Sequence, residues 1–199
     1  MKKHRTQEIT AGVCFLLATV SYMAGSGMVE GELAAIVSKP VPFTFTLAAG
    51  MLLELVNCAA VAVIGVMLYR RLKLQMQSVA FGYMLSRAAE AVLLAVGSFA
   101  GLLRASGALA LHGRLLYTGM LILGLYSTIF CAALLKKAIG PRWLLITGAI
   151  GYAALAVYAV INLTGACVAD PMWLLTPGTA FEIVFPVWLI VKGFPKQEA

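Results

Sequence analysis

The sequence predicts an all-α, polytopic membrane protein: a single domain, residues 1–199, built as a bundle of six transmembrane helices. Its 199 residues are 62% hydrophobic and only 12% charged, whereas a soluble domain is about half apolar and about a quarter charged. Apolar stretches of about 20 residues, each long enough to cross a bilayer as a helix, follow one another along the chain. The predicted spans are Ile9–Met28, Phe43–Tyr69, Ser78–Leu102, Arg114–Leu135, Trp143–Thr164 and Met172–Val191.

The first span follows the basic segment MKKHR and so resembles a signal peptide. No small-x-small cleavage site clearly follows it, and we expect the segment to remain as a membrane helix. The second and third spans are expected to form a hairpin through the basic turn at residues 70–73, and the fourth and fifth through residues 136–142. In the sixth span Pro177 and Pro186 flank Glu182, and prolines inside a helix are expected to bend it.

The basic residues indicate the topology. If the spans alternate in direction, one side of the membrane receives Lys2, Lys3, Arg5, Arg70, Arg71, Lys73, Lys136, Lys137, Arg142, Lys192 and Lys196, and the other receives only Lys39, Arg104 and Arg114. Cytoplasmic loops carry the excess of Lys and Arg, so both termini are predicted to be cytoplasmic. The net charge of +7 is thereby explained by topology and contacts with anionic lipids, not by nucleic-acid binding.

The cysteines indicate no redox or metal chemistry. Cys14, Cys58 and Cys131 fall inside spans, and Cys167 stands alone in an outer loop. No CxxC pair and no metal-ligand spacing is present. We therefore predict free thiols that act as small packing residues, and neither a cofactor nor a metal site.

Three carboxylates are predicted to share the bilayer midplane. Glu90 is the midpoint of the third span, Glu54 lies close to the midpoint of the second, and Glu182 is the midpoint of the sixth. A charged side chain at this depth costs at least ~2.5–3.5 kcal/mol on insertion scales. These side chains are therefore expected to face the bundle interior and to pair there.

A second polar level is predicted about 4–5 Å nearer the cytoplasm. Asn57 and Arg87 lie there, each three residues from Glu54 or Glu90 and so on the same helix face. We expect Arg87 to pair with Glu54 or Glu182 from another helix. The fourth and fifth spans bring further hydroxyl groups to this depth, those of Tyr126, Ser127, Thr128 and Tyr152.

Two interpretations of this polar layer remain open. An ion-pair network could serve only to fix the register of the helices. However, three carboxylates face one guanidinium, so either some of them hold protons or a cation or cationic ligand completes the site. Nearer the outer face, a vestibule that attracts an anionic head group is the alternative to ordinary loop residues, and its candidates are His112, Arg114, Tyr117 and Asn162.

Four segments resemble the DUF4386 family of bacterial integral membrane proteins: GMLLELVNCAAVAVIGVMLYRRLK, AFGYMLSRAAEAVLL, KKAIGPRWLLITGAIG and FEIVFPVWLIVKGF. The more specific motifs are Glu54-x-x-Asn57, Arg87-x-x-Glu90, Pro141-Arg142-Trp143 and Glu182. The similarity extends from the first span to Phe194. It implies a six-helix bacterial membrane protein, and it supplies no catalytic residues. The expected location is the bacterial cytoplasmic membrane.

Three functions are consistent with these residues. The first is binding or transport of a cation, a proton or a small amphiphile at the midplane, with membrane lipids as partners and a homodimer as a plausible assembly. The second is an intramembrane enzyme that moves protons on a lipid or isoprenoid-like substrate. The chain lacks GxSxG and HExxH motifs, which disfavours a lipid hydrolase. The third is a non-catalytic accessory membrane subunit.

Overall fold

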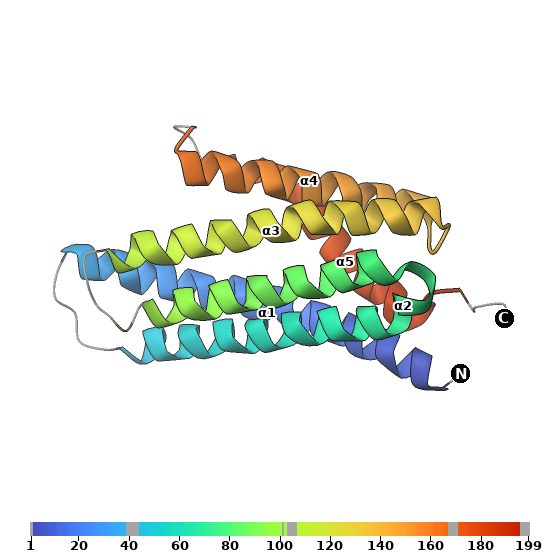
Figure 1. The fold of residues 1–199 in the computed structure, drawn as a ribbon. Helices are drawn as coiled ribbons and strands as arrows, with labels where there is room; N and C mark the ends of the chain where they lie inside the picture. The colour runs from blue at the N-terminus through green and yellow to red at the C-terminus, as the bar shows by residue number, and fades with distance from the viewer. Residues whose placement is uncertain (1, 39–43, 101, 103–106, 167–170, 196–199) are drawn as a thin grey trace.

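The structure, a computed structural model, describes residues 2–38, 44–100, 102, 107–166 and 171–195 (Figure 1). Within them all regular structure is helical. The elements are α1 (Lys2–Ser38), α2 (Phe45–Ala100), α3 (Ala108–Lys136), α4 (Arg142–Thr164), the short 3₁₀ helix η2 (Met172–Leu175) and α5 (Thr176–Val191). The all-helical class predicted from the sequence is therefore confirmed.

The number of helices differs from the prediction. Five helices in the described part of the chain are long and apolar enough to cross a membrane, and the count of six is not supported. The predicted second and third spans form one helical element, α2, which is interrupted at Met76 by a non-helical backbone (φ −155°, ψ 59°). We call residues 45–75 the first arm of α2 and residues 77–100 its second arm.

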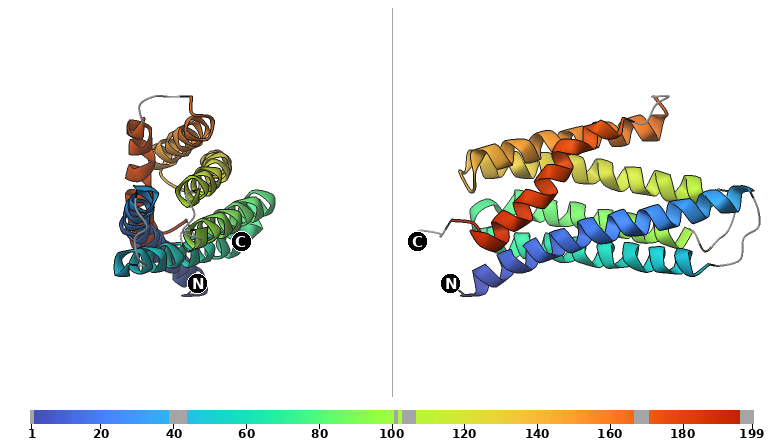
Figure 2. Two further views of the ribbon diagram at one scale, coloured as in Figure 1. Left: turned by 90° about the vertical axis from the view of Figure 1, so that its left-hand side faces the viewer. Right: turned by 180° about the vertical axis from the view of Figure 1, so that it is seen from behind.

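The two arms of α2 run side by side in opposite directions (Figures 1 and 2). The ring of Tyr69 lies 5.9 Å from that of Phe81, and a Cβ added at Gly65 would lie 3.0 Å from the Cβ of Arg87. Gly65 and Arg87 each lie eleven residues from Met76. The reversal is therefore centred on Met76, and the expected turn at residues 70–73 is wrong.

Residues 70–73 remain helical because the bundle buries part of them. Leu72 is fully buried and Arg71 nearly so. The Nε of Arg71 lies 2.6 Å from the Glu8 carboxylate of α1, and its guanidinium also covers the ring of Phe194. A segment held by these contacts cannot serve as a solvated turn, so the chain reverses one helical turn later.

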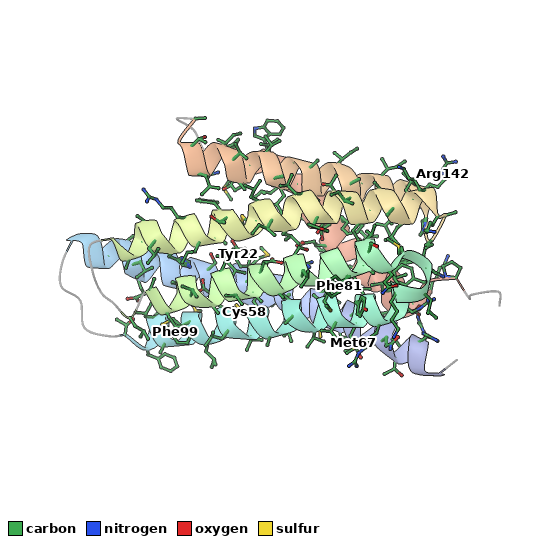
Figure 3. The ribbon with its side chains drawn as sticks, viewed as in Figure 1. Tyr22, Cys58, Met67, Phe81, Phe99 and Arg142 are labelled. Atoms are coloured by element: carbon green, nitrogen blue, oxygen red, sulfur yellow. The ribbon has the colours of Figure 1, made fainter. Side chains whose placement is uncertain are left out.

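Both termini lie at one end of the bundle, together with the reversal at Met76 and the connection between α3 and α4 (Figure 1). α3 ends at Lys136 and α4 begins at Arg142, so this connection carries basic residues. Arg142 is drawn at this end in Figure 3. The basic residues Lys39, Arg104 and Lys196 lie outside the described residues. The structure thus groups most described basic residues at the end that holds the termini.

Glycines allow the helices to approach closely, as is usual in membrane bundles. Gly124 of α3 faces the backbone of Tyr152 in α4, where an added Cβ would lie 2.7 Å from the carbonyl oxygen. Gly151 of α4 faces Gly178 of α5 in the same way, at 2.6 Å. A larger side chain at either glycine would force the two helices apart.

α5 runs obliquely across the bundle and contacts both α1 and α4 (Figure 2). Its aromatic side chains fill the space between them. Phe185 meets Phe15 of α1 edge to face at 5.8 Å and stacks on Phe181 at 4.7 Å. Pro186 lies inside this helix, but Pro177 lies in its first turn, where proline is well tolerated. A bend within α5 therefore stays a prediction for Pro186, whereas Pro177 lies where η2 is followed by α5.

The described cysteines Cys14, Cys58 and Cys131 are free thiols, as expected, and Cys167 lies outside the described residues. Cys58 and Cys131 are buried. They pack as small apolar side chains within the bundle.

Candidate functional site

The buried polar residues form two separate clusters, not one layer. The core cluster consists of Tyr83, Arg87, Glu90, Tyr152 and Glu182. The cavity cluster consists of Glu54, Ser98 and His112.

Arg87 is the centre of the core cluster, and its side chain is only 3% exposed. Its Nη1 donates to Oε2 of Glu90 at 2.8 Å, and its Nε donates to the hydroxyl oxygen of Tyr83 at 2.9 Å. The guanidinium also lies 5.3 Å from the centre of the Phe15 ring and 5.4 Å from that of Tyr83. These contacts compensate much of the cost of burying the charge.

Glu182 completes the core cluster from α5. The hydroxyl of Tyr152 in α4 donates to its Oε1 at 3.3 Å, and its carboxylate lies within electrostatic range of Arg87. Glu182 is half-buried, whereas Tyr152 and Arg87 are buried. The predicted ion pair between Arg87 and a carboxylate of another helix is not formed, because the guanidinium bonds Glu90 of its own helix.

Glu54 lies away from the core cluster because of the reversal at Met76. Glu54 and Ser98 each lie 22 residues from Met76, so they face each other across the two arms, and the Ser98 hydroxyl donates to Oε2 of Glu54. Ser98 is eight residues beyond Glu90, which corresponds to about 12 Å along a helix. The predicted common depth of Glu54 and Glu90 is therefore wrong.

Glu54 also pairs with His112 of α3. Its Oε1 lies 3.2 Å from Nε2 of His112, and both side chains are buried, at 6% and 4% exposure. An ionised carboxylate can only accept, so Nε2 then carries the imidazole proton and Nδ1 offers a lone pair. Within the described residues, Nδ1 has no hydrogen-bond partner.

His112 lines a cavity of about 360 Å³ at the end of the bundle opposite the termini. The four residues proposed for an outer vestibule, His112, Arg114, Tyr117 and Asn162, all line it. The remaining lining residues are Glu30, Leu109, Ala110 and Gly113. His112 was predicted to lie apart from the buried acids, but it contacts Glu54, so the vestibule and one of these acids form a continuous site.

The other predicted polar residues lie apart from both clusters or at their margins. Asn57 is buried on the first arm, one helical turn from Glu54. Ser127 is also buried, and among the described residues its hydroxyl has no hydrogen-bond partner. Tyr126 is 39% exposed, and its ring packs against Gly82. None of the hydrogen bonds within the two clusters involves Tyr126, and its expected place in the polar layer stays a prediction.

Three residues of these sites were not predicted from the sequence: Ser98, Tyr83 and Tyr22. Ser98 is fully buried on α2, whereas the adjacent Phe99 is half-exposed and points away from the bundle (Figure 3). Tyr22 of α1 bonds Ser26 and lies within electrostatic range of both Glu30 and Glu54. Tyr83 could have been found from the sequence, because it lies four residues before Arg87 and so on the same face of the helix.

No group of three or more His, Cys, Asp or Glu side chains that could hold a metal ion occurs in the part of the chain that the structure describes. The clusters offer hydrogen-bonding groups and charges, which suit proton transfer or the binding of a polar head group.

Comparison with known proteins agrees with the sequence resemblance. Residues 10–193 match the family described as a domain of unknown function, DUF4386. Neither the curated proteins nor the solved structures contain a match. The matched region covers nearly the whole chain, including both polar clusters and the residues that line the cavity. The chain therefore belongs to the DUF4386 family.

Proposed function

We propose that this multi-pass membrane protein binds a small amphiphile, whose polar head occupies the cavity at the end opposite the termini. One observation carries this proposal: a cavity of about 360 Å³ is lined by His112, and Nε2 of this histidine lies 3.2 Å from the buried carboxylate of Glu54. A buried charge placed directly behind a cavity is costly unless it serves a ligand or the fold. Ser98 and His112 hold this carboxylate in place on the cavity side of the bundle.

The size and chemistry of the cavity support a small ligand. Binding sites for small molecules commonly measure about 300–1,000 Å³ and combine apolar walls with a few convergent polar groups. Here Leu109 and Ala110 supply apolar surface, while His112, Tyr117 and Asn162 supply polar groups. The cavity lies near the first turn of α3 and the last turn of α4, where the lipid head-group region would begin if these helices cross a bilayer.

A substitution that fills the cavity tests this proposal. A Cβ at Gly113 would meet only the Tyr117 ring, at 3.8 Å, which is an ordinary contact. Gly113→Leu should therefore fold and occupy part of the cavity. Gly27→Leu is the matched control, because Gly27 lies in α1 with no atom within 4 Å of an added Cβ.

Binding would be measured with purified protein and two single-chain lipids, lysophosphatidylethanolamine and lysophosphatidylglycerol, by native mass spectrometry and the shift in melting temperature. At least one lipid should bind the parent and Gly27→Leu, and bind Gly113→Leu about tenfold more weakly, a loss of about 1.4 kcal/mol. Equal binding to all three proteins, or no binding to any, would contradict the proposal.

A second candidate function follows from the Glu54–His112 pair. A histidine oriented by a carboxylate, with its second nitrogen unpaired, is the arrangement of a general base. His112 could take a proton from a substrate at Nδ1 and return it at another atom, as an isomerase does. Incubating the two lysolipids with the protein in deuterated water tests this, since deuterium exchange into a C–H bond of the lipid by the parent and not by His112→Gln would indicate catalysis.

The core cluster supports the proposal that the protein also transports a proton or an ion. Arg87, Glu90 and Glu182 place charges inside the bundle, and intramembrane charges often mark proton or ion pathways.

We also propose that the end carrying the termini faces the cytoplasm, because it carries the excess of basic residues. The membrane is then a bacterial cytoplasmic membrane. The homodimer and the lipid contacts stay predictions.

A further inference from the structure

We propose that the head group bound in this cavity is zwitterionic, with its cationic group beside Glu30 and its anionic group beside Arg114. The inference rests on the proposed binding function and names the chemical class of its ligand. A phosphoethanolamine group is an example, whether it belongs to a membrane lipid or to a water-soluble molecule.

Two opposite charges line the cavity without neutralising each other. Glu30 of α1 and Arg114 of α3 are both lining residues. The salt bridges among the described residues do not include a pair between them. The cavity therefore presents an anionic and a cationic group to one occupant.

The Glu30 side is anchored and acidic. The Ser26 hydroxyl donates to Oε1 of Glu30 at 3.1 Å, which helps to fix the carboxylate on its helix. Glu30 also lies within electrostatic range of Glu54 and of His112. Two carboxylates acting on the same region favour a cationic group there, and they disfavour an anion.

The Arg114 side differs in chemistry. A guanidinium binds phosphate or carboxylate groups through paired hydrogen bonds. In the described part of the chain, the Arg114 side chain forms no ion pair or hydrogen bond, and it is exposed. It is therefore available to an anionic group at the cavity mouth.

A ligand of a single charge fits this arrangement poorly. An anion would satisfy Arg114 but would meet the repulsion of Glu30 and Glu54, and a cation would meet the repulsion of Arg114. A ligand with both charges satisfies both sides at once. His112 lines the same cavity, and within the described residues its buried Nδ1 is left without a hydrogen-bond partner.

The test compares three water-soluble probes: glycerophosphoethanolamine, which carries both charges, glycerophosphate, which carries only negative charge, and ethanolamine, which carries only positive charge. Lysophosphatidylethanolamine and lysophosphatidylglycerol form a second arm that distinguishes a lipid source from a soluble one. Dissociation constants are measured for the parent and for Glu30→Gln and Arg114→Gln. The matched controls are Glu32→Gln on α1 and Arg142→Gln at the opposite end of the bundle, because neither lines the cavity.

The parent should bind the zwitterionic probes more tightly than either singly charged probe. Each variant at the cavity should lose about tenfold to hundredfold in affinity for the zwitterion, because a hydrogen bond to a charged group is lost. Glu30→Gln should at the same time gain affinity for glycerophosphate, and Arg114→Gln should gain affinity for ethanolamine. The two control variants should bind as the parent does.

A parent that prefers a singly charged probe, or variants that keep the zwitterion affinity of the parent, would overturn the inference. Its failure is distinct from failure of the proposed function. If lysolipids bind in a manner blocked by Gly113→Leu but insensitive to charge at positions 30 and 114, the binding function stands and the zwitterion does not. If Gly113→Leu blocks no binding, the proposed function itself fails.

Discussion

The carboxylate of Glu8 and the guanidinium of Arg71 form a buried ion pair, with 2.6 Å between Oε1 and Nε. The same oxygen accepts a hydrogen bond from the backbone N–H of Phe194, at 3.3 Å, and Nη2 of Arg71 donates to the carbonyl oxygen of Pro195 at 3.1 Å. The pair therefore joins α1, the first arm of α2 and the chain that follows α5. It connects segments that are far apart in the sequence.

Removal of one member of this pair should strongly destabilise the bundle. Arg71→Gln leaves the buried Glu8 with only the more distant Arg5, whose Nη1 lies 3.5 Å from Oε2. Breaking a buried pair from one side typically costs ~3–5 kcal/mol. The measurement is the free energy of unfolding in mixed detergent micelles, from titration with a denaturing detergent. Glu8→Gln should show a loss of similar size.

The neighbouring Arg70 provides the control for this prediction. Arg70 is exposed and differs from Arg71 by one position along the same helix. Arg70→Gln should change the free energy of unfolding by less than about 0.5 kcal/mol. Equal losses in the two arginine variants would show that the ion pair does not stabilise the bundle.

A double-mutant cycle at Arg87 and Glu90 should separate a structural role from a functional one. Arg87→Met and Glu90→Met each break the buried pair and should cost ~3–5 kcal/mol in the free energy of unfolding. If the pair only fixes the fold, the double variant should cost less than either single one, because an apolar pair of similar volume can replace a buried ion pair.

Glu182 supplies the second step of this experiment. It lies within electrostatic range of Arg87 but bonds Tyr152 instead. If Arg87 balances the charge of Glu182, adding Glu182→Gln to the Arg87→Met, Glu90→Met double variant should recover part of the stability that this variant lost. A double variant that is as stable as the parent, and whose stability Glu182→Gln does not change, would assign Arg87 and Glu90 to the scaffold alone.

The class of the fold could be predicted from the sequence because hydropathy and helix length are local properties. Apolar runs of about 20 residues identify helices that can cross a membrane without any knowledge of how they pack. The pairing of the two arms of α2 was not predictable in this way, because it depends on contacts between residues far apart in the sequence. The break lies at Met76 in the segment LKLQMQS, which contains neither Gly nor Pro, whereas the basic residues 70–73 have the composition of a turn.

The candidate site was only partly predictable for the same reason. Glu54 and Glu90 were placed at one depth by counting from the midpoints of the predicted spans, and this count depends on where the hairpin reverses. Burial of Leu72 and Arg71 moves the reversal to Met76. Glu54 thereby faces Ser98 and meets His112, a contact that no residue spacing in the sequence indicates.

A disulfide should report the register between α2 and α3 near the cavity cluster. A Cβ at Gly97 would lie 3.6 Å from the Cβ of Leu115, within the range of about 3.5–4.5 Å found in disulfides. In a background without the native cysteines, Gly97→Cys combined with Leu115→Cys should therefore crosslink on mild oxidation. The crosslink is measured as the loss of two free thiols by mass spectrometry.

The control for this crosslink uses the adjacent position. Leu116 lies about 100° further around α3 than Leu115, because a helix has 3.6 residues per turn. Gly97→Cys combined with Leu116→Cys should crosslink much less. Preferential crosslinking of the pair with Leu116 would place His112 on a different face of α3 and would remove its contact with Glu54.

The orientation in the membrane can be tested at the two ends of α4. Lys137 is exposed in the connection before this helix, and Gly165 is exposed directly after it. In cysteine-free protein, Gly165→Cys should react with a membrane-impermeant maleimide added to intact cells, and Lys137→Cys should react only after the cells are permeabilised. The reason is the excess of basic residues at the end that holds Lys137, which favours the cytoplasmic side. The reverse pattern would mean that the cavity faces the cytoplasm, so its ligand would have to come from that side. Labelling of both positions in intact cells would mean that α4 does not cross the membrane, although its 23 residues are long enough.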